Sequence, residues 1–454
     1  MDLAAALDWL DARLNHETGS VGLAAGKVDG LSLEPVEALM ALLGDPQHAM
    51  PVVHITGTNG KGSVAAMVTR LLEAHGLSVG TYTSPHLSRV NERIGRNGEP
   101  ISDAELAEAL AGVAAVEPLL DQPPTWFEVV TAAAFRWFAE APVDVAVVEV
   151  GLLGRYDATN VVDAQVAVVT SIGADHTDGA PGWELQVAGE KAGILTSQCT
   201  AVLGEMAPEL VEVFRAEGPA RLWVAGAEFG VRTDVPAVGG RLLTVDGHYG
   251  AYDDLLLPLH GAHQSANAAV AVAATEAFFD RALDPDVVRA GLAAVRVPGR
   301  TEVVAHSPLV VLDGAHNTDA LAALARTVEE DFTTAGSRVV VLGMLAGRDP
   351  VAACEVVATL RPDLVVCTTV DGARGLPAAA LAAAATAAGL PVEVDDDPAR
   401  AVERVLAHAD EEDTVVVTGS FRLLAAARAV VDRFVASQPA PPQFGDVFGV
   451  GDDA

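Results

Sequence analysis

The segment VHITGTNGKGSV, residues 53–64, joins an apolar run to a glycine-rich turn that carries a single lysine, Lys61. A buried strand, a glycine turn and a helix start together bind phosphate, because backbone N–H groups and the helix N-terminus offer a fixed positive field. The strict pattern G-x-x-x-x-G-K-[ST] is not met, since position 55 is Ile55 and Gly62 separates Lys61 from Ser63. We nevertheless predict a nucleotide-binding loop, in which Lys61 adds a mobile charge and Ser63 can reach a metal ion.

Polar side chains end three other apolar runs. Glu149 closes VDVAVVEV, His176 follows QVAVVTS, and Ser84 follows the run that ends in TYT. In an open parallel sheet the carboxyl ends of the strands line the ligand crevice, so these groups can converge beside the phosphate loop. Oxygen donors suit the Mg²⁺ that accompanies ATP. Ser84, Glu149 and His176 are therefore candidate magnesium ligands, although a histidine after a strand is more often an ordinary loop residue.

Lysine is rare in this chain, where 3 lysines (Lys27, Lys61 and Lys191) stand against 25 arginines. Arginine stays protonated and is not a compact charge, so a retained lysine can have a role that arginine cannot fill. Lys191 lies in GEKAGIL on an expected helix. If its surroundings kept it neutral, it could add carbon dioxide and ligate metal as a carbamate. A surface or salt-bridged lysine is the simpler alternative.

The second half holds a further group of polar residues at expected element ends. They are His263, Gln264 and Asn267 in GAHQSAN, Arg300 in PGR, and Asp313 and His316 in DGAHN. An amide at a helix start can read an adenine edge or simply cap the helix. A cation and an acid at a domain junction suit a ligand clamped by closure, or form an interdomain salt bridge.

These residues need elements to position them, and the first half alternates strand-like and helical patterns. Strands are expected at 52–56, 79–83, 143–150, 165–171 and 200–204, and helices at 63–76, 103–117, 127–141, 185–195 and 207–217. Near-continuous apolar strands separated by helices predict a parallel sheet covered on both faces. Residues 220–258 (from RLWVAG to GHYG and beyond) predict a small antiparallel excursion, followed by helices at 263–280 and 284–295.

A second alternating series begins after VPGR, near 297–301. Its strands are expected at 309–313, 337–344, 363–368, 391–394 and 413–418, and its last helix at 420–435. We predict an α/β chain with a P-loop ATPase-type parallel-sheet domain at 1–298 and a Rossmann-like α/β domain at 299–437. The Pro/Gly/Asp-rich stretch 438–454 is expected to be a disordered tail.

The composition excludes some classes of binding partner for this chain. The net charge of −34 repels nucleic acid and acidic membranes, so any anionic substrate must be held by a local exception to the overall field. There is no uncharged apolar run of transmembrane length, and the acidic N-terminus does not resemble a secretory signal. Three scattered cysteines are too few for a disulfide framework or a metal cluster. We expect a cytoplasmic protein.

Taken together, the motifs resemble the Mur ligase superfamily and, within it, the folylpolyglutamate synthase/dihydrofolate synthase family. The resemblance covers about residues 20–435 and is carried, in order, by GTNGKGS, TSPHL with NERI, PTWFE, EVGLLGRYDATN, TSIGADHTD, GEKAGI, HQSAN, PGR, DGAHN and GSFR. GKG followed by Ser distinguishes the folate branch from cell-wall ligases, which read GKTT or similar. Leu153 and Tyr156 stand where many members have glycine and leucine, and Leu33-Glu34 where others have an acid and arginine.

The resemblance implies site residues. For ATP they are Asn59, Gly60, Lys61, Gly62, Ser63, Asn267, Arg300 and Asp313, and for magnesium Ser63, Ser84, Glu149, His176 and Lys191, the last as a carbamate. For the pterin side they are Asp29, Gly30, Thr125, Phe127, Glu128, Tyr156 and Asp157. The residues expected to be catalytic are Lys61, His176, Lys191 and His316.

The implied reaction is ATP-dependent amide ligation of L-glutamate to dihydropteroate, tetrahydrofolate or both, through an acyl phosphate. ATP and two Mg²⁺ ions are the implied cofactors, a monovalent cation is a further candidate, and the family default is a monomer. Two alternatives remain: a Mur-type ligase for a cell-wall precursor or an amino-acid polymer, and an ATP-binding paralogue without activity. GKGS and PTWFE argue against the first, and the intact metal positions against the second.

Overall fold

The structure is a computed structural model, and it describes residues 1–15, 32–175, 177 and 180–437. Its first sheet has eight strands in the order β4-β3-β2-β5-β1-β6-β7-β8. The strands are β1 (Val52–Thr56), β2 (Val79–Tyr82), β3 (Ile94–Arg96), β4 (Glu99–Pro100), β5 (Val145–Glu149), β6 (Ala164–Val169), β7 (Thr200–Leu203) and β8 (Arg221–Val224). All pairs from β2 to β8 are parallel, and β3 and β4 add an antiparallel edge.

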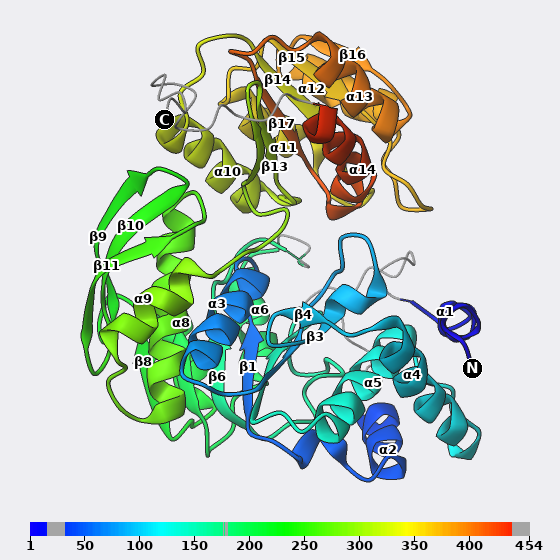
Figure 1. The fold of residues 1–454 in the computed structure, drawn as a ribbon, viewed down its shortest axis with the longest axis vertical. Helices are drawn as coiled ribbons and strands as arrows, with labels where there is room; N and C mark the ends of the chain where they lie inside the picture. The colour runs from blue at the N-terminus through cyan, green and yellow to red at the C-terminus, as the bar shows by residue number, and fades with distance from the viewer. Residues whose placement is uncertain (16–31, 176, 178–179, 438–454) are drawn as a thin grey trace, which may run out of the picture.

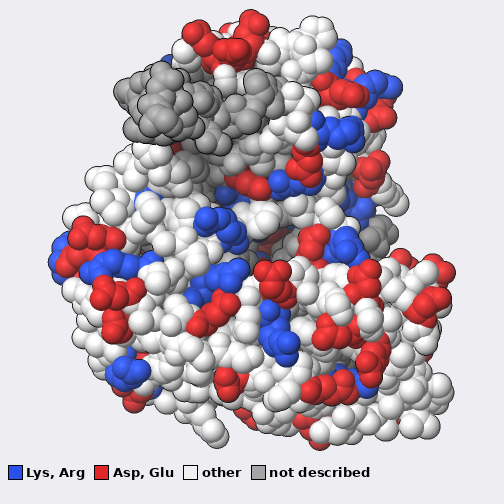
Figure 2. All heavy atoms as spheres, in the orientation of Figure 1, with Lys and Arg blue, Asp and Glu red and all other residues white. Residues whose placement is uncertain are grey.

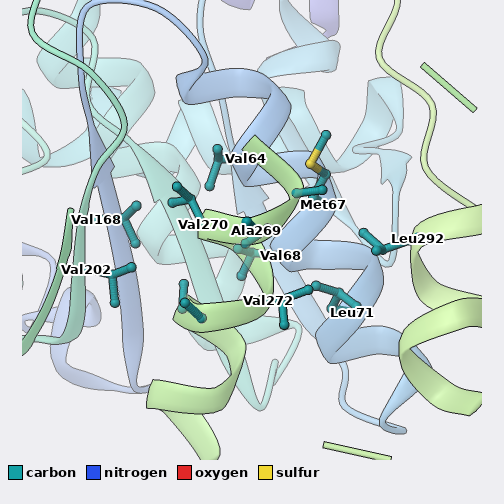
Figure 3. Packing of buried hydrophobic residues seen from close by; sticks show 14 of the residues in the cluster. Val64, Met67, Val68, Leu71, Val168, Val202, Ala269, Val270, Val272 and Leu292 are labelled. Carbon is teal, nitrogen blue, oxygen red and sulfur yellow. The ribbon is translucent and has the colours of Figure 1, made fainter. Parts of the chain in front are cut away.

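Helices cover both faces of this sheet, as its apolar strands require. The helices are α1 (Leu3–Asp11), α2 (Glu34–Leu42), α3 (Lys61–Ala74), α4 (Asp103–Val116), α5 (Trp126–Glu140), α6 (Trp183–Ala192), α7 (Pro208–Ala216), α8 (Ala262–Phe279) and α9 (Pro285–Ala293). Single 3-10 turns lie at Pro46–His48, Val90–Arg93 and Glu117–Leu119. Figure 3 shows the core on one face, where Val68 and Leu71 of α3 lie beside Ala269 and Val272 of α8. This packing fixes α3, and with it the turn that precedes it.

The antiparallel excursion is a separate three-stranded sheet of β9 (Gly230–Ala237), β10 (Gly240–Asp246) and β11 (Ala251–Leu257). Its predicted start at residue 220 is wrong, because RLWV forms β8 and pairs in parallel with β7. The reason is burial: Trp223 packs into the main core, and a strand that follows α7 as a β-α-β unit joins the same sheet in parallel.

The second sheet has six strands in the order β12-β13-β17-β14-β15-β16. They are β12 (Glu302–His306), β13 (Leu309–Leu312), β14 (Arg338–Leu342), β15 (Leu364–Cys367), β16 (Val392–Val394) and β17 (Thr414–Thr418). The helices are α10 (Thr318–Asp331), α11 (Pro350–Ala358), α12 (Ala378–Ala387), α13 (Pro398–His408) and α14 (Phe421–Ser437). Only β12, an antiparallel edge strand, was not expected from the sequence in this part.

The two α/β parts lie one above the other, with the second part at the top (Figure 1). The first ends with α9 at Ala293 and the second begins with β12 at Glu302, so the predicted boundary at 298/299 lies in the segment between these elements. The predicted α/β class with two parallel sheets is confirmed. In the described part of the chain, no helix is both long and apolar enough to span a membrane.

Candidate active site

A cavity of about 1700 Å³ lies between the two α/β parts. Its lower wall is built by segments that follow β1, β2, β5 and β6, including Gly57–Lys61, Ser84–Ser88 and the turns around Asp157 and Asp175. Its upper wall is built by segments that follow β14, β15 and β17. The carboxyl ends of both parallel sheets therefore face one space, which is the usual ligand position in such folds.

The phosphate loop is held rigidly against the neighbouring strand. The N–H of Thr58 donates to the Ser171 carbonyl at 2.9 Å, and the Thr170 hydroxyl donates to the Asn59 carbonyl at 2.6 Å. Gly60 has φ of +88°, and a Cβ there would lie 2.6 Å from Oδ1 of Asn267. Only glycine fits this turn, which leads directly into α3. The loop is thus pre-formed for an anion.

Lys61 lies at the first position of α3 and reaches back over the loop. Its Nζ donates to the carbonyl of Gly57 at 3.0 Å and to that of Thr58 at 3.4 Å. Glu149 lies close to the same helix start, because a Cβ on Gly62 would be 3.6 Å from its Oε2. The Lys61 ammonium and the Glu149 carboxylate therefore both lie near the start of α3.

Glu149 is 2% exposed, and its Oε2 accepts from the N–H of Ser84 at 2.9 Å. Burial raises the pKa of its carboxyl, against the opposing effect of Lys61 and the Ser84 hydrogen bond. A poorly solvated carboxylate suits a hard cation with oxygen ligands. Ser84 lines the cavity with Glu149, whereas Ser63 is buried in the first turn of α3 and does not line it. Within the described ranges, no group of three or more His, Cys, Asp and Glu is arranged to hold a metal.

Lys191 lies near the end of α6 and is 4% exposed. The pKa of its ammonium is lowered to about 7, chiefly by burial and also by Lys61, while Asp175 and Asp157 act in the opposite direction. A lysine in these surroundings is partly neutral at neutral pH, which is the condition for adding carbon dioxide. The alternative of an ordinary surface lysine is therefore wrong, because the side chain is buried.

Three predicted residues, Asp29, Gly30 and His176, lie outside the described residues. On either side of position 176, Asp175 and Thr177 both line the cavity. The loop after β6 therefore reaches the site as expected.

The other residues predicted for the pterin side lie together in the cavity wall, and they are Thr125, Phe127, Glu128, Tyr156 and Asp157. Thr125 and Glu128 form the capping box of α5, with the Thr125 N–H donating to Glu128 Oε2 at 2.6 Å. Asp157 accepts from the N–H groups of Leu152 and Thr159 and from the Thr159 hydroxyl. The carboxylates of Glu128 and Asp157 are thus held by hydrogen bonds within their own segments. Tyr156, by contrast, is 40% exposed.

Four predicted residues come from the second half. Arg300 and His316 line the cavity, whereas Asn267 and Asp313 do not. Asn267 stands against Gly60, and its Nδ2 donates to Gln264 Oε1 at 3.0 Å. Burial lowers the pKa of the Arg300 guanidinium, whose centre lies 4.5 Å from the Phe421 ring centre. Asp313 accepts from the N–H of Thr301 at 2.7 Å and so shapes the junction.

Direct contacts between the two α/β parts were not predicted from the sequence. The side-chain amides of Asn59 and Asn317 pair reciprocally at 3.3 and 3.0 Å. Asp175 pairs with Arg348, and its Oδ2 lies 3.6 Å from His316 Nε2. Asn317 stands in the DGAHN motif, but a partner 258 positions away leaves no local signal in the sequence.

His54 was also missed, because it stands in the middle of an apolar strand pattern. It is fully buried in β1, and burial lowers its pKa to about 3. Its Nε2 lies 2.9 Å from the Thr159 hydroxyl, which itself donates to Asp157 Oδ1. Since that hydroxyl proton is already donated, the neutral ring donates from Nε2. His54 therefore supports Asp157 from within the sheet.

Comparison with known proteins shows the family to which the chain belongs. The Mur ligase middle domain family matches residues 55–275, and the family described as the Mur ligase, glutamate ligase domain matches residues 299–421. A dihydrofolate synthase/folylpolyglutamate synthase of Mycobacterium tuberculosis is 42% identical over 443 residues, which cover 88% of this chain and 90% of the relative. Its counterpart in Escherichia coli is 34% identical over 413 residues, which cover 89% and 92%.

Solved structures agree as well. The folylpolyglutamate synthase of Mycobacterium tuberculosis complexed with ADP has a TM-score of 0.86 at 40% identity, covering 94% of this chain and 98% of that chain. An Escherichia coli relative in complex with DHPP and ADP has a TM-score of 0.83 at 33% identity, covering 95% and 98%. The chain belongs to the folylpolyglutamate synthase/dihydrofolate synthase family of the Mur ligases.

Proposed function

We propose that this ATP-dependent ligase joins L-glutamate through an amide bond to the carboxylate of dihydropteroate, tetrahydrofolate or both. One observation carries the proposal: Lys61 interacts electrostatically with both Glu149 and the buried Lys191, and all three line the interdomain cavity. A paralogue without activity would have no reason to keep a buried lysine and a buried carboxylate, because each costs folding free energy. The names of the relatives supply the substrate class.

The nucleotide binds at the loop Gly57–Lys61. Asn267 of α8 stands against Gly60 within the first part, and Arg300 and Asp313 belong to the second part. The N–H groups of the loop face the phosphates, and among the described residues the Lys61 ammonium donates to carbonyls of the loop, which a phosphate can replace. Arg300 is held by the Phe421 ring at the junction, where it can contact the nucleotide when the two parts close.

The reaction begins when an oxygen of the acceptor carboxylate attacks the γ-phosphorus of ATP. The bond to the ADP oxygen breaks, and an acyl phosphate forms. The amine of L-glutamate then attacks the acyl carbon, and inorganic phosphate leaves with one oxygen of the former carboxylate. Such transfer depends on positioning and on neutralising charge, which Lys61 and the loop N–H groups provide.

The glutamate ammonium must lose a proton before it attacks. His316 suits this step, because its Nδ1 lies 2.9 Å from the Gly314 carbonyl and donates to it, which leaves Nε2 to accept a proton. Asp175 Oδ2, 3.6 Å from Nε2, stabilises the imidazolium that results. Closure of the two parts over the ligands would keep water from the acyl phosphate.

Magnesium fits the donor set. Ser63, Ser84 and Glu149 would hold one ion, and His176 with a carbamate on Lys191 a second. When bound, Mg²⁺ neutralises phosphate charge and aligns the phosphate with the carboxylate. The carbamate forms when the neutral Lys191 amine adds to carbon dioxide and loses a proton. A monovalent cation, a monomeric state and a cytoplasmic location remain expectations from the sequence.

Isotope transfer tests the acyl phosphate. The acceptor is labelled with ¹⁸O in its carboxylate and incubated with ATP, Mg²⁺ and L-glutamate, and the released phosphate is analysed by mass spectrometry. We expect one ¹⁸O atom in each phosphate and an equimolar glutamylated product. Unlabelled phosphate alongside the same product would exclude the acyl phosphate.

A further inference from the structure

The segment 83–93 joins β2 to β3, and residues 84–88 of it line the cavity. The N–H of Thr83 donates to the carbonyl of Arg93 at 2.9 Å, which closes the segment at its base. Near its start, the N–H of Ser84 donates to Oε2 of Glu149 at 2.9 Å. The segment therefore contacts the buried carboxylate of the candidate site directly.

The carboxylate of Glu92 holds the middle of this segment. Its Oε2 accepts from the N–H of Leu87 at 2.7 Å. Its Oε1 accepts from the N–H groups of Ser88 at 3.0 Å and Arg89 at 2.8 Å. Three successive N–H groups on one carboxylate leave the backbone little freedom. The position of the Leu87 side chain is therefore set by hydrogen bonds within the segment.

Leu87 joins this segment to the second part. Its side chain is partly buried against an apolar cluster that is built from β13, β14, β15, β17, α13 and α14. All other members of this cluster that the structure describes belong to the second part. Because the contact removes apolar surface from water, it favours the docked arrangement of the two parts.

The charges on α14 agree with this contact. Arg428 of α14 pairs with Glu302, with 3.0 Å between Nη1 and Oε1. Burial acts to lower the pKa of the Arg428 guanidinium, but Glu302, Asp432 and Glu92 raise it overall. Glu92 is thus close enough to α14 to act on a cation there, although it belongs to the first part. The segment therefore lies next to the second part, as the packing of Leu87 requires.

We propose that Leu87 is a positioning residue, which makes the geometry of Ser84 and Glu149 depend on the docking of the second part. The inference rests on the proposed function, because a reaction in the cavity is what gives these two residues a role. Leu87 and Ser84 belong to one hydrogen-bonded segment, so a displacement of the first is passed to the second. Docking thereby completes the site on the first part, and phosphate is transferred only when both walls are in place.

The test compares full-length Leu87→Ala with wild type by amide hydrogen exchange and by initial rates. Exchange is followed in peptides that cover residues 84–92 and, as an internal reference, residues 57–62. Leu364→Ala is the matched control, because Leu364 packs on the same cluster from within the second part and does not line the cavity. Leu87→Met keeps an apolar side chain of similar volume and should retain most of the wild-type behaviour.

We expect exchange across residues 84–92 to be about tenfold faster in Leu87→Ala, with residues 57–62 unchanged. The kcat should fall about ten- to hundredfold, because small misplacements of reacting groups have effects of this size. KM for ATP should stay within about twofold of wild type. The reason is that the phosphate loop is held by its own hydrogen bonds to Thr170 and Ser171. Leu364→Ala should change none of these quantities.

Unchanged exchange across residues 84–92 in Leu87→Ala would overturn the inference, whatever its kcat. Faster exchange with kcat within about twofold of wild type would also overturn it. Equal effects in Leu364→Ala would do the same, because they would reflect stability alone. If Leu87→Ala does not fold, Leu87→Val decides by the same measurements, with smaller changes in the same direction expected. Failure of the proposed function is distinguishable, because exchange needs no turnover and wild type would then show no glutamate-dependent phosphate release.

Discussion

At the scale of single residues, the site depends on charges held where water is scarce. Glu149 and Lys191 are almost completely buried. Burial raises the pKa of the Glu149 carboxyl and lowers that of the Lys191 ammonium, so it favours the neutral form of each group. Strong shifts of this kind in a cavity are a mark of functional groups. The sequence singled out both residues by their context, but burial itself could not be predicted from it.

The ligation rate of Lys191→Ala should be at least about a hundredfold lower than that of wild type. Acetate or another small carboxylate should restore part of this rate. In wild type, activity should also fall as the pH drops through about 7, because the protonated amine cannot form a carbamate. Initial rates from pH 6 to 8.5 with controlled bicarbonate measure both effects. Full activity of Lys191→Ala without rescue would remove the carbamate from the mechanism.

The buried His54 should make the folding stability depend on pH. Its pKa is about 3 in the folded chain and ordinarily near 6.5, so the unfolded chain gains a proton as the pH falls through 6.5 and folding stability is lost. At pH 5 this loss is about 2 kcal/mol relative to pH 7. The His54→Gln variant keeps a donor for Thr159. Between pH 7 and pH 5, its free energy of unfolding in urea should fall by about 2 kcal/mol less than that of wild type. An unchanged dependence would contradict the assignment.

At the scale of elements, helix α10 links the two α/β parts at both of its ends. Near its start, Asn317 pairs with Asn59 of the phosphate loop, and Asp319 accepts from the N–H of Ala174 at 3.3 Å. At its end, Asp331 pairs with Arg241 of β10 and accepts from the N–H of Gly261. The antiparallel sheet thus supports the second part as well as packing on the first.

Elements with strong local patterns were predictable, and contacts between distant elements were not. The parallel strands and their helices follow from apolar runs and turn residues, so they appear within a few residues of their expected bounds. β12 and β8 were misjudged because their place depends on which sheet they complete. Likewise, DGAHN was recognisable, but nothing near Asn317 could reveal its pairing with Asn59.

Asn317→Ser tests the link between α10 and the phosphate loop. Serine keeps an N-cap for α10, which Asn317 provides to the N–H of Ala320, but it is too short to pair with Asn59. We expect stability within about 0.5 kcal/mol of wild type and KM for ATP about tenfold higher, from two lost hydrogen bonds. Asp284→Ser, a matched change at the cap of α9, should leave KM unchanged. An ATP KM equal to wild type would show that the pair does not couple the parts.

Leu153 gives a second prediction at this scale. It has φ of +59°, and its buried side chain packs with Val187 of α6, the helix that carries Lys191. Alanine would keep the unfavourable backbone conformation and lose the packing, whereas glycine would lose the packing and relieve the backbone. Leu153→Gly should therefore be more stable than Leu153→Ala by about 1 kcal/mol in urea unfolding. The opposite order would rule out strain at this position.

At the scale of the whole molecule, the cavity lies between two parallel sheets whose carboxyl ends face each other. The phosphate loop belongs to one wall, and segments that follow β14, β15 and β17 form the other, so the proposed ligation requires both parts at once. The chain carries a net charge of −34, but Figure 2 shows Lys and Arg side chains around the hollow between the two parts, where they can offset the negative field for an anionic substrate. This arrangement explains how one chain can bring ATP, an acceptor carboxylate and an amino acid together.

Phosphate release with different acceptors tests the central claim most directly. The chain is incubated with ATP, Mg²⁺ and L-glutamate, and with dihydropteroate, tetrahydrofolate or a UDP-muropeptide in separate reactions. We predict release that depends on glutamate with dihydropteroate, tetrahydrofolate or both, and none with the muropeptide. Release with the UDP-muropeptide alone, or no release with either pterin acceptor, would contradict the account.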